Sequence, residues 1–262
     1  MTTLAPGPRF GRSPRLGEPN RRFRLALIAL LLLVPLLWLL FTSCQSEEEN
    51  GTAPVSGALG DYALEGRRGP ECLRLTLMVD SSGSMQDYAG ARDAALNRLV
   101  PWLAKNLRDS DELAVIDFAQ TANVRLPPTA ARSVGSAPGA PAVADGGGTL
   151  LAPALAEVDR FPASKCDTAV LLLSDAQVSD LPLGEPAGRT LLQQHDVSDI
   201  ELLVPGHAID VPAGWTTAFP AAQPRKFDGY DPDATAVAIG RTVAELTGQQ
   251  LARSRASATP SR

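Results

Sequence analysis

The fold of this chain is most strongly constrained by short, nearly continuous apolar runs that alternate with segments of helical periodicity. The runs are residues 73–79 (LRLTLMV), 112–118 (ELAVIDF), 168–173 (TAVLLL) and 200–204 (IELLV). Runs of this length that are apolar on both faces are typical of parallel strands inside a sheet. Strands that alternate with helices form one sheet with helices on both faces. The sequence therefore predicts an α/β fold with a three-layer, doubly wound (Rossmann-like), mostly parallel sheet.

The segments between the runs supply the helices. Residues 88–107 carry an apolar side chain at every fourth position, the spacing of one helix face: Ala91, Ala95, Leu99 and Leu103. Pro101 in this segment either kinks the helix or starts a second one. Further helices are expected at residues 150–161, 187–194 and 234–252, and a Pro-, Ala- and Gly-rich loop at residues 132–148.

The N-terminal part of the chain has the features of a membrane-targeting segment. Residues 25–41 carry no charge and approach the roughly twenty apolar residues that span a bilayer. Residues 1–24 form a basic tail with six Arg and one Glu, which the positive-inside rule places in the cytoplasm. Residues 25–43 are then either an uncleaved transmembrane signal anchor or a lipoprotein signal peptide that leaves Cys44 as a lipid-carrying N-terminus. Both alternatives predict a single-pass or lipid-anchored protein of the cell membrane, with its main body on the periplasmic or extracytoplasmic side.

The rest of the chain divides by composition. Residues 44–70 are polar, Gly-rich and aperiodic, which is typical of a flexible linker. Residues 71–250 contain the periodic segments and are expected to form one domain, and residues 251–262 are expected to be a disordered tail. Of the 24 basic and 29 acidic side chains, 18 and 28 lie beyond residue 24. This acidic body argues against nucleic acid as a partner, because it offers no basic surface to phosphates.

Oxygen-bearing side chains follow two of the apolar runs, at the edge of a parallel sheet where ligands bind. Asp80, Ser82 and Ser84 follow the first run in the pattern D-x-S-x-S. Thr149 follows three glycines, and Asp175 comes shortly after the third run. Hard oxygen donors without Cys or His suit Mg²⁺, or alternatively Mn²⁺ or Ca²⁺, and not Zn²⁺. Each segment alone is also compatible with a Ser/Gly turn, a flexible or phosphate-binding loop, or a helix cap.

Together the five residues resemble the metal-ion-dependent adhesion site (MIDAS) of the von Willebrand factor A (VWA) family, which is shared with integrin I domains. That site takes D-x-S-x-S, a Thr and an Asp from three loops. The resemblance covers about residues 71–250, and the spacing of 65 residues from Ser84 to Thr149 and 26 more to Asp175 fits the family. It implies that the five side chains hold one divalent ion, whose open position takes an Asp or Glu of a partner protein. The chain is then expected to be a membrane-tethered binding module and not an enzyme.

Two other functions remain open from the sequence. One is a structural assembly subunit of an envelope complex, in which a metal would be only structural. The other is a metal-dependent hydrolase that uses Asp80. Phosphatases of the D-x-D type need an acidic residue two positions after Asp80, where this chain has Ser82, which weakens the hydrolase alternative.

Two of the three cysteines have similar offsets from the predicted metal ligands. Cys72 lies eight residues before Asp80, and Cys166 lies nine before Asp175. In the fold that the resemblance implies, the two strands are neighbours about 4.8 Å apart, so the cysteines come close at the opposite edge of the sheet. An oxidising compartment favours a disulfide between them.

The remaining candidates are interpreted as structural. His195 and His207 lie in no catalytic or metal-binding pattern, so both are expected on the surface or in loops. Four aromatic residues that precede the last helix are interpreted as part of the core: Trp215, Phe219, Phe227 and Tyr230.

Overall fold

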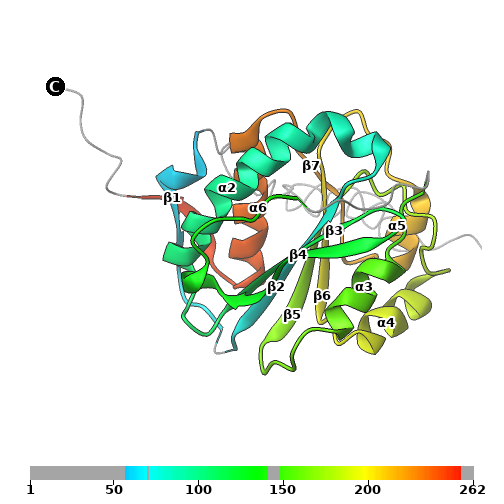
Figure 1. Ribbon diagram of the computed structural model, residues 1–262, viewed down its shortest axis with the longest axis horizontal. Helices are drawn as coiled ribbons and strands as arrows, with labels where there is room; N and C mark the ends of the chain where they lie inside the picture. Colours follow the sequence, from blue (N-terminus) through cyan, green and yellow to red (C-terminus); the bar gives the residue numbers. More distant parts are fainter. Residues whose placement is uncertain (1–56, 70, 141–147, 255–262) are drawn as a thin grey trace, which may run out of the picture. The chain divides into compact units, whose positions relative to one another are not determined.

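The computed structural model describes residues 57–69, 71–140 and 148–254 of the chain (Figure 1). All of these residues belong to one compact unit, Val55–Arg262. The predicted membrane segment at residues 25–41 and the candidate lipidation site Cys44 lie outside the described residues. Within the described ranges, no helix is both long and apolar enough to cross a membrane.

A six-stranded sheet forms the centre of this unit, in the order β4-β3-β2-β5-β6-β7. Its strands are β2 (Leu73–Asp80), β3 (Glu112–Phe118), β4 (Ala122–Ala130), β5 (Asp167–Leu173), β6 (Asp199–Val204) and β7 (Arg225–Lys226). All neighbours pair in parallel except β3 and β4, which are antiparallel, so the predicted mostly parallel sheet is confirmed. The strand order changes direction between β2 and β5. In open α/β sheets, ligands bind beyond the carboxyl ends of the strands at such a point.

Helices cover both faces of this sheet (Figure 1). On one face lie α2 (Ala89–Asn106) and α6 (Pro232–Leu246), and on the other lie α3 (Ala152–Asp159), α4 (Glu185–Gln194) and α5 (Ala213–Ala218). The side chains of β2 alternate between the two cores: Leu75 and Leu77 belong to the α2 side, and Met78 belongs to the α3 side. All residues of β2 are buried, which explains why its sequence is an apolar run and not an alternating one.

Pro101 neither breaks α2 nor starts a second helix. The helix runs through this residue over 18 residues. Pro101 lacks an N–H to bond the carbonyl of Asn97, and both residues are exposed, so water can satisfy that carbonyl. The helix therefore keeps one continuous apolar face against the sheet, which includes Leu99 and Leu103.

The segments expected as a flexible linker and a disordered tail are partly ordered, which corrects both expectations. Strand β1 (Tyr62–Glu65) lies within the predicted linker, strand β8 (Gln250–Arg253) runs into the predicted tail, and the two pair antiparallel. The predicted final helix also ends earlier, at Leu246, because Gly248 takes φ 69°. The N–H of Gly248 bonds the carbonyl of Glu245, and the next N–H bonds the carbonyl of Ala244, as in a Schellman helix end.

Buried contacts attach strand β1 and the residues just before it to the rest of the domain. Leu59 is 1% exposed and packs in the core of the α2 face. The indole N–H of Trp102 in α2 donates to the carbonyl of Tyr62 at 2.7 Å, and the N–H of Leu64 donates to the side chain of Asn106 at 3.0 Å. The ordered domain therefore begins before β2, within the segment that the sequence analysis assigned to the linker.

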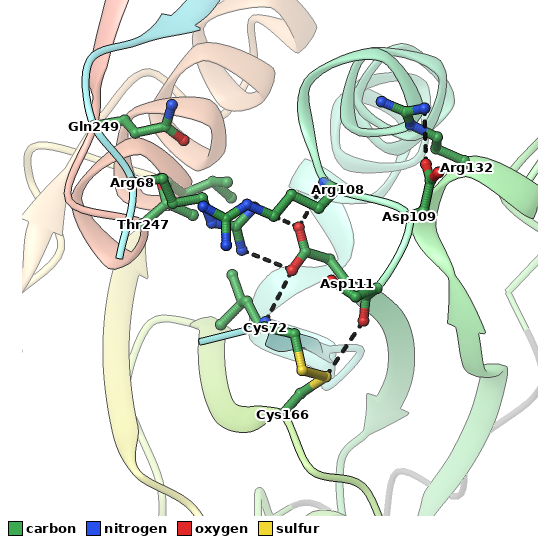
Figure 2. A network of polar contacts seen from close by, with 12 residues as sticks. Arg68, Cys72, Arg108, Asp109, Asp111, Arg132, Cys166, Thr247 and Gln249 are labelled. Atoms are coloured by element: carbon green, nitrogen blue, oxygen red, sulfur yellow. Dashed lines mark hydrogen bonds and ion pairs between the residues drawn. A yellow bond between two sulfur atoms is a disulfide. The ribbon is translucent and has the colours of Figure 1, made fainter. Parts of the chain in front are cut away.

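The structure contains the disulfide that the sequence analysis expects. Cys72 and Cys166 are bonded, with their Cα atoms 4.6 Å apart (Figure 2). They precede β2 and β5, and the N–H of Asp167 donates to the carbonyl of Cys72 at 3.0 Å. Beside the disulfide, the guanidinium of Arg68 makes two hydrogen bonds to the carboxylate of Asp111, at 2.5 and 2.7 Å. This edge of the sheet is thus closed by a covalent bond and a buried ion pair.

Removing the disulfide should destabilise the domain. The bond joins residues 94 apart in the sequence. In the chain-entropy account, a loop of that length stabilises the folded state by about 4.7 kcal/mol. We expect a Cys72→Ser/Cys166→Ser variant of the full-length chain to lose about that free energy of unfolding in urea titrations, with Cys44→Ser as the control that leaves it unchanged. A double variant as stable as the wild type would contradict this role.

Candidate functional site

The first predicted metal loop begins at the last residue of β2. Asp80 is fully buried, and its Oδ1 accepts a hydrogen bond from the N–H of Ser82 at 2.9 Å. The hydroxyls of Ser82 and Ser84 lie 3.1 Å apart. The 3-10 helix η2 (Gly83–Tyr88) carries the chain onward into α2. The D-x-S-x-S pattern therefore presents one carboxylate and two neighbouring hydroxyls at the end of a central strand.

The loop after β5 meets the first loop directly. The hydroxyl of Ser174 donates to Oδ2 of Asp80 at 2.6 Å and accepts the N–H of Ala176 at 3.0 Å. Ala176 has a φ of 61°, a left-handed conformation that side chains rarely adopt and that concentrates at functional sites. Asp175 lies between them, 6% exposed, with its Oδ1 accepting the N–H of Gln177. The sequence analysis missed Ser174, because a lone Ser after a strand carries no pattern of its own.

Thr149 is joined to the loop after β5. It forms an isolated parallel bridge with Val178, and its carbonyl accepts the N–H of Ser179 at 2.9 Å. The carboxylate of Asp180 then accepts the N–H groups of Leu151 and Ala152, at 2.7 and 2.9 Å. Thr149 is 4% exposed. The three predicted loops thus meet at the carboxyl ends of β2 and β5.

The electrostatics of this place favour a cation. Burial raises the pKa of the Asp80 carboxyl, hydrogen bonds from Ser174 and Ser82 lower it, and the nearby charge of Asp175 raises it further. No Lys, Arg or His of the described residues forms an ion pair with either carboxylate. A divalent ion would compensate both charges, so the residues present fit such a group.

Most of the predicted ligands are hydroxyls, and the described part of the site contains no cluster of three or more carboxylate, imidazole or thiol groups. Among the described residues, no group of three or more His, Cys, Asp or Glu side chains could hold a metal ion. The five predicted ligands would offer two carboxylates and three hydroxyls, from Asp80, Asp175, Ser82, Ser84 and Thr149. Oxygen donors of this kind suit Mg²⁺, Mn²⁺ or Ca²⁺.

The aromatic residues before α6 are only partly in the core. Trp215, Phe219 and Phe227 are buried, as expected, but Tyr230 is 64% exposed and corrects that interpretation. Its ring contacts that of Tyr88 in a tilted arrangement, with centroids 4.7 Å apart and an angle of 41° between the ring planes. Burial, Tyr230 and the charges of Asp87 and Asp175 raise the pKa of Tyr88, so this aromatic pair, of which Tyr230 is exposed and Tyr88 half-buried, lies within the electrostatic reach of Asp175.

The two histidines stay away from the site, as the sequence predicts. The Nδ1 atom of His195 lies 2.9 Å from the carboxylate of Asp159, at the end of α3. His207 is exposed, and its carbonyl accepts a hydrogen bond from Lys226. Neither contact places an imidazole beside Asp80 or Ser82.

No family model and no curated protein matches the chain. Solved structures that resemble it include proximal thread matrix protein 1 from the mussel byssus (12% identity, TM-score 0.46, 70% of this chain and 48% of that chain). Others are BatB from Bacteroides thetaiotaomicron (16%, 0.45, 67% and 99%) and a von Willebrand factor type A protein from Catenulispora acidiphila (18%, 0.45, 72% and 50%). The chain spans about half the length of the first and third. The mussel protein has also been solved with a zinc-occupied MIDAS motif.

The topology and the motif of this chain together define its class. The sheet is mostly parallel with helices on both faces, and D-x-S-x-S, Thr149 and Asp175 meet at the carboxyl ends of β2 and β5. The chain has the fold of a von Willebrand factor A domain. At these identities and TM-scores, what the solved structures bind does not transfer to this chain.

Asp180 should hold the Thr149 loop in place. Its carboxylate is the acceptor for two N–H groups at the start of α3, and replacing such a cap costs about 1–2 kcal/mol. We expect Asp180→Ala to lower the free energy of unfolding by that amount in urea titrations. Asp180→Asn retains one acceptor oxygen and should lose less. Equal stability of the Ala variant and the wild type would show that water satisfies these N–H groups.

Proposed function

We propose that the domain binds one divalent metal ion, Mg²⁺ or alternatively Mn²⁺ or Ca²⁺, through Asp80, Ser82, Ser84, Thr149 and Asp175. One observation carries this proposal. The buried charged residues of the described chain include Arg74, Arg92, Asp111, Asp117 and Arg125, and each has an ion-pair partner. The two remaining ones, Asp80 and Asp175, have no ion-pair partner within residues 57–69, 71–140 and 148–254. Burying a carboxylate without compensation is costly, so a site that keeps two of them is suited to a cation.

The proposed ion serves to bind a partner protein. A bound divalent ion would supply a strong local positive charge with a position open to an external carboxylate. Three of the five donors are neutral hydroxyls, so the donor set neutralises the ion less than a set of carboxylates would. An Asp or Glu of the partner is the ligand that this site would favour.

The surroundings of the site support a protein as the partner. The exposed Tyr230 contacts the ring of Tyr88, at the end of the 3-10 helix that begins beside Ser84. Tyr side chains are enriched at protein interfaces, because they bury a large area and keep a polar end. We further propose that the N-terminal segment tethers the domain to the cell membrane, on its extracytoplasmic side.

The alternatives differ in what they demand of the site. A hydrolase needs a base beside the metal, and among the described residues no His or Lys contacts Asp80, Ser82 or Asp175. We therefore propose a binding protein without turnover of its own. A structural subunit of an envelope complex would bind its partner whether or not the ion is present. Partner binding measured with and without EDTA therefore distinguishes this alternative from the proposed one.

Metal binding should depend on the charge of Asp80. We expect calorimetry on the full-length chain to show one Mg²⁺ or Mn²⁺ site, and expect the site to be lost in Asp80→Asn, which keeps the size of the side chain. At a metal concentration 100 times the dissociation constant, the wild type should gain about 2.7 kcal/mol of stability. Asp167→Asn is a matched control, since Asp167 is exposed at the opposite end of β5. Unchanged binding in Asp80→Asn would refute the assignment.

Partner binding should require the ion and Thr149. Crosslinking pull-downs with and without EDTA would first identify proteins that need the metal. For such a partner, Thr149→Ala should weaken binding in Mg²⁺ by about tenfold, which corresponds to about 1.4 kcal/mol, without unfolding the domain. Equal affinity for wild type and variant, in Mg²⁺ and in EDTA, would favour the structural-subunit alternative.

A further inference from the structure

Four charged side chains form a continuous network behind the first metal loop: Arg92 and Asp93 of α2, Asp117 of β3 and Arg125 of β4. Nε of Arg125 donates to Asp117 at 2.7 Å, and its Nη2 makes a second bond to the same carboxylate. Nη1 of Arg125 lies 3.1 Å from Asp93, and Nε of Arg92 lies 3.6 Å from the same oxygen. We call these four residues the arginine–aspartate network.

The network holds the backbone of the first metal loop from behind. Nη1 of Arg92 donates to the carbonyl of Asp80 at 2.8 Å. The hydroxyl of Ser81 donates to Asp117 at 3.3 Å, and the N–H of Ser81 donates to the carbonyl of Phe118 at 2.8 Å. These contacts involve the carbonyl of Asp80 and the N–H and hydroxyl of Ser81. The carboxylate of Asp80 and the hydroxyl of Ser82 take no part in them and face the candidate site.

Fold stability alone gives a weak reason to keep such a network. The side chains of Asp117, Arg125 and Arg92 are 0%, 2% and 6% exposed. Replacing buried ion pairs by apolar residues of similar volume is often neutral or stabilising. A buried polar network is therefore better explained by what it positions, and these contacts end on the metal loop.

The charges in the network also balance. Two guanidinium groups alternate with two carboxylates, so the network places no net positive charge behind the cation site. An unpaired arginine in that position would repel a divalent ion through the low-dielectric interior. The network can therefore fix the loop without opposing the metal.

We propose that Arg125 is a positioning residue for the metal site: through Asp117 and Ser81 it sets the place of the first loop, and the affinity for the ion depends on it. Arg125 touches none of the five proposed ligands in the described contacts. The proposal rests on the function proposed above, because it concerns the same site. Outer partners of metal ligands commonly change metal affinity by 10- to 100-fold when they are replaced.

The chain offers a matched control at the other edge of its sheet. Arg68 and Asp111 also form a two-bond ion pair, with side chains 7% and 0% exposed, beside the disulfide (Figure 2). This pair contacts the backbone of Leu73 and Arg108 and no residue of the three metal loops. Loss of Arg68 removes a comparable interaction without reaching the site.

The experiment compares Mn²⁺ affinity in Arg125→Met and Arg68→Met of the full-length chain, with melting temperatures in EDTA as the measure of stability. We expect both variants to melt lower in EDTA. The dissociation constant for Mn²⁺ should rise about tenfold or more in Arg125→Met and stay within about twofold in Arg68→Met. In Asp117→Leu/Arg125→Met, which removes both charges, stability should recover while the affinity for Mn²⁺ stays low. Arg125→Lys, which keeps the charge, should recover part of the affinity.

Two results would overturn the proposal. Wild-type affinity in Arg125→Met or in the double variant would show that the loop keeps its place without the network. An equal loss of affinity in Arg68→Met would show that metal binding follows overall stability. If the wild type binds no Mn²⁺, the proposed function itself fails, and that result is distinguishable from both of these. Should Arg125→Met not fold, the double variant and Arg125→Lys decide the matter.

Discussion

The buried carboxylate of Asp80 is the constraint on which the rest of this site depends. It stands at the last position of a fully buried strand and has no basic partner among the described residues. Its two oxygens accept the N–H of Ser82 and the hydroxyl of Ser174, so the loops after β2 and β5 are organised around one group. The left-handed backbone of Ala176 is held by the same hydroxyl. Unfavourable burial and backbone strain thus coincide at the edge where a parallel sheet binds ligands.

The opposite edge of the sheet is stabilised in a different way. There the disulfide joins the chain before β2 to the chain before β5, and the ion pair of Arg68 and Asp111 lies beside it (Figure 2). Strands β1 and β8 add a second pairing between segments at the two ends of the domain. Covalent and fully paired interactions therefore hold one end of the sheet. The other end of the sheet can therefore keep the buried carboxylates of Asp80 and Asp175, whose charges no basic side chain of the described residues compensates.

Local patterns were enough to predict the parallel sheet, because it depends on strand position and residue type. The disulfide was predicted from the offsets of its cysteines together with the strand order that the family resemblance implies, and the structure contains it. The assignment of the five oxygen donors to a metal stays a prediction. The β1–β8 pairing was not predictable, since two strands of four residues each, separated by most of the chain, carry no local signal. Asp117 was hidden inside an apolar run and Arg125 inside the edge strand β4, so their pairing needs the register of β3 and β4. Tyr230 looked like Phe227 in sequence, and only the fold separates the exposed ring from the buried one.

The accessibility of the donors sets the direction from which a partner can reach the proposed ion. Asp80, Thr149 and Asp175 are buried, whereas Ser84 is exposed. From Ser84 the 3-10 helix leads within four residues to Tyr88, whose ring contacts that of Tyr230. If a partner carboxylate reached the proposed ion past Ser84, the surface around it would meet this aromatic pair. Under that proposal the ion would select the carboxylate, and the two rings would discriminate among the side chains next to it.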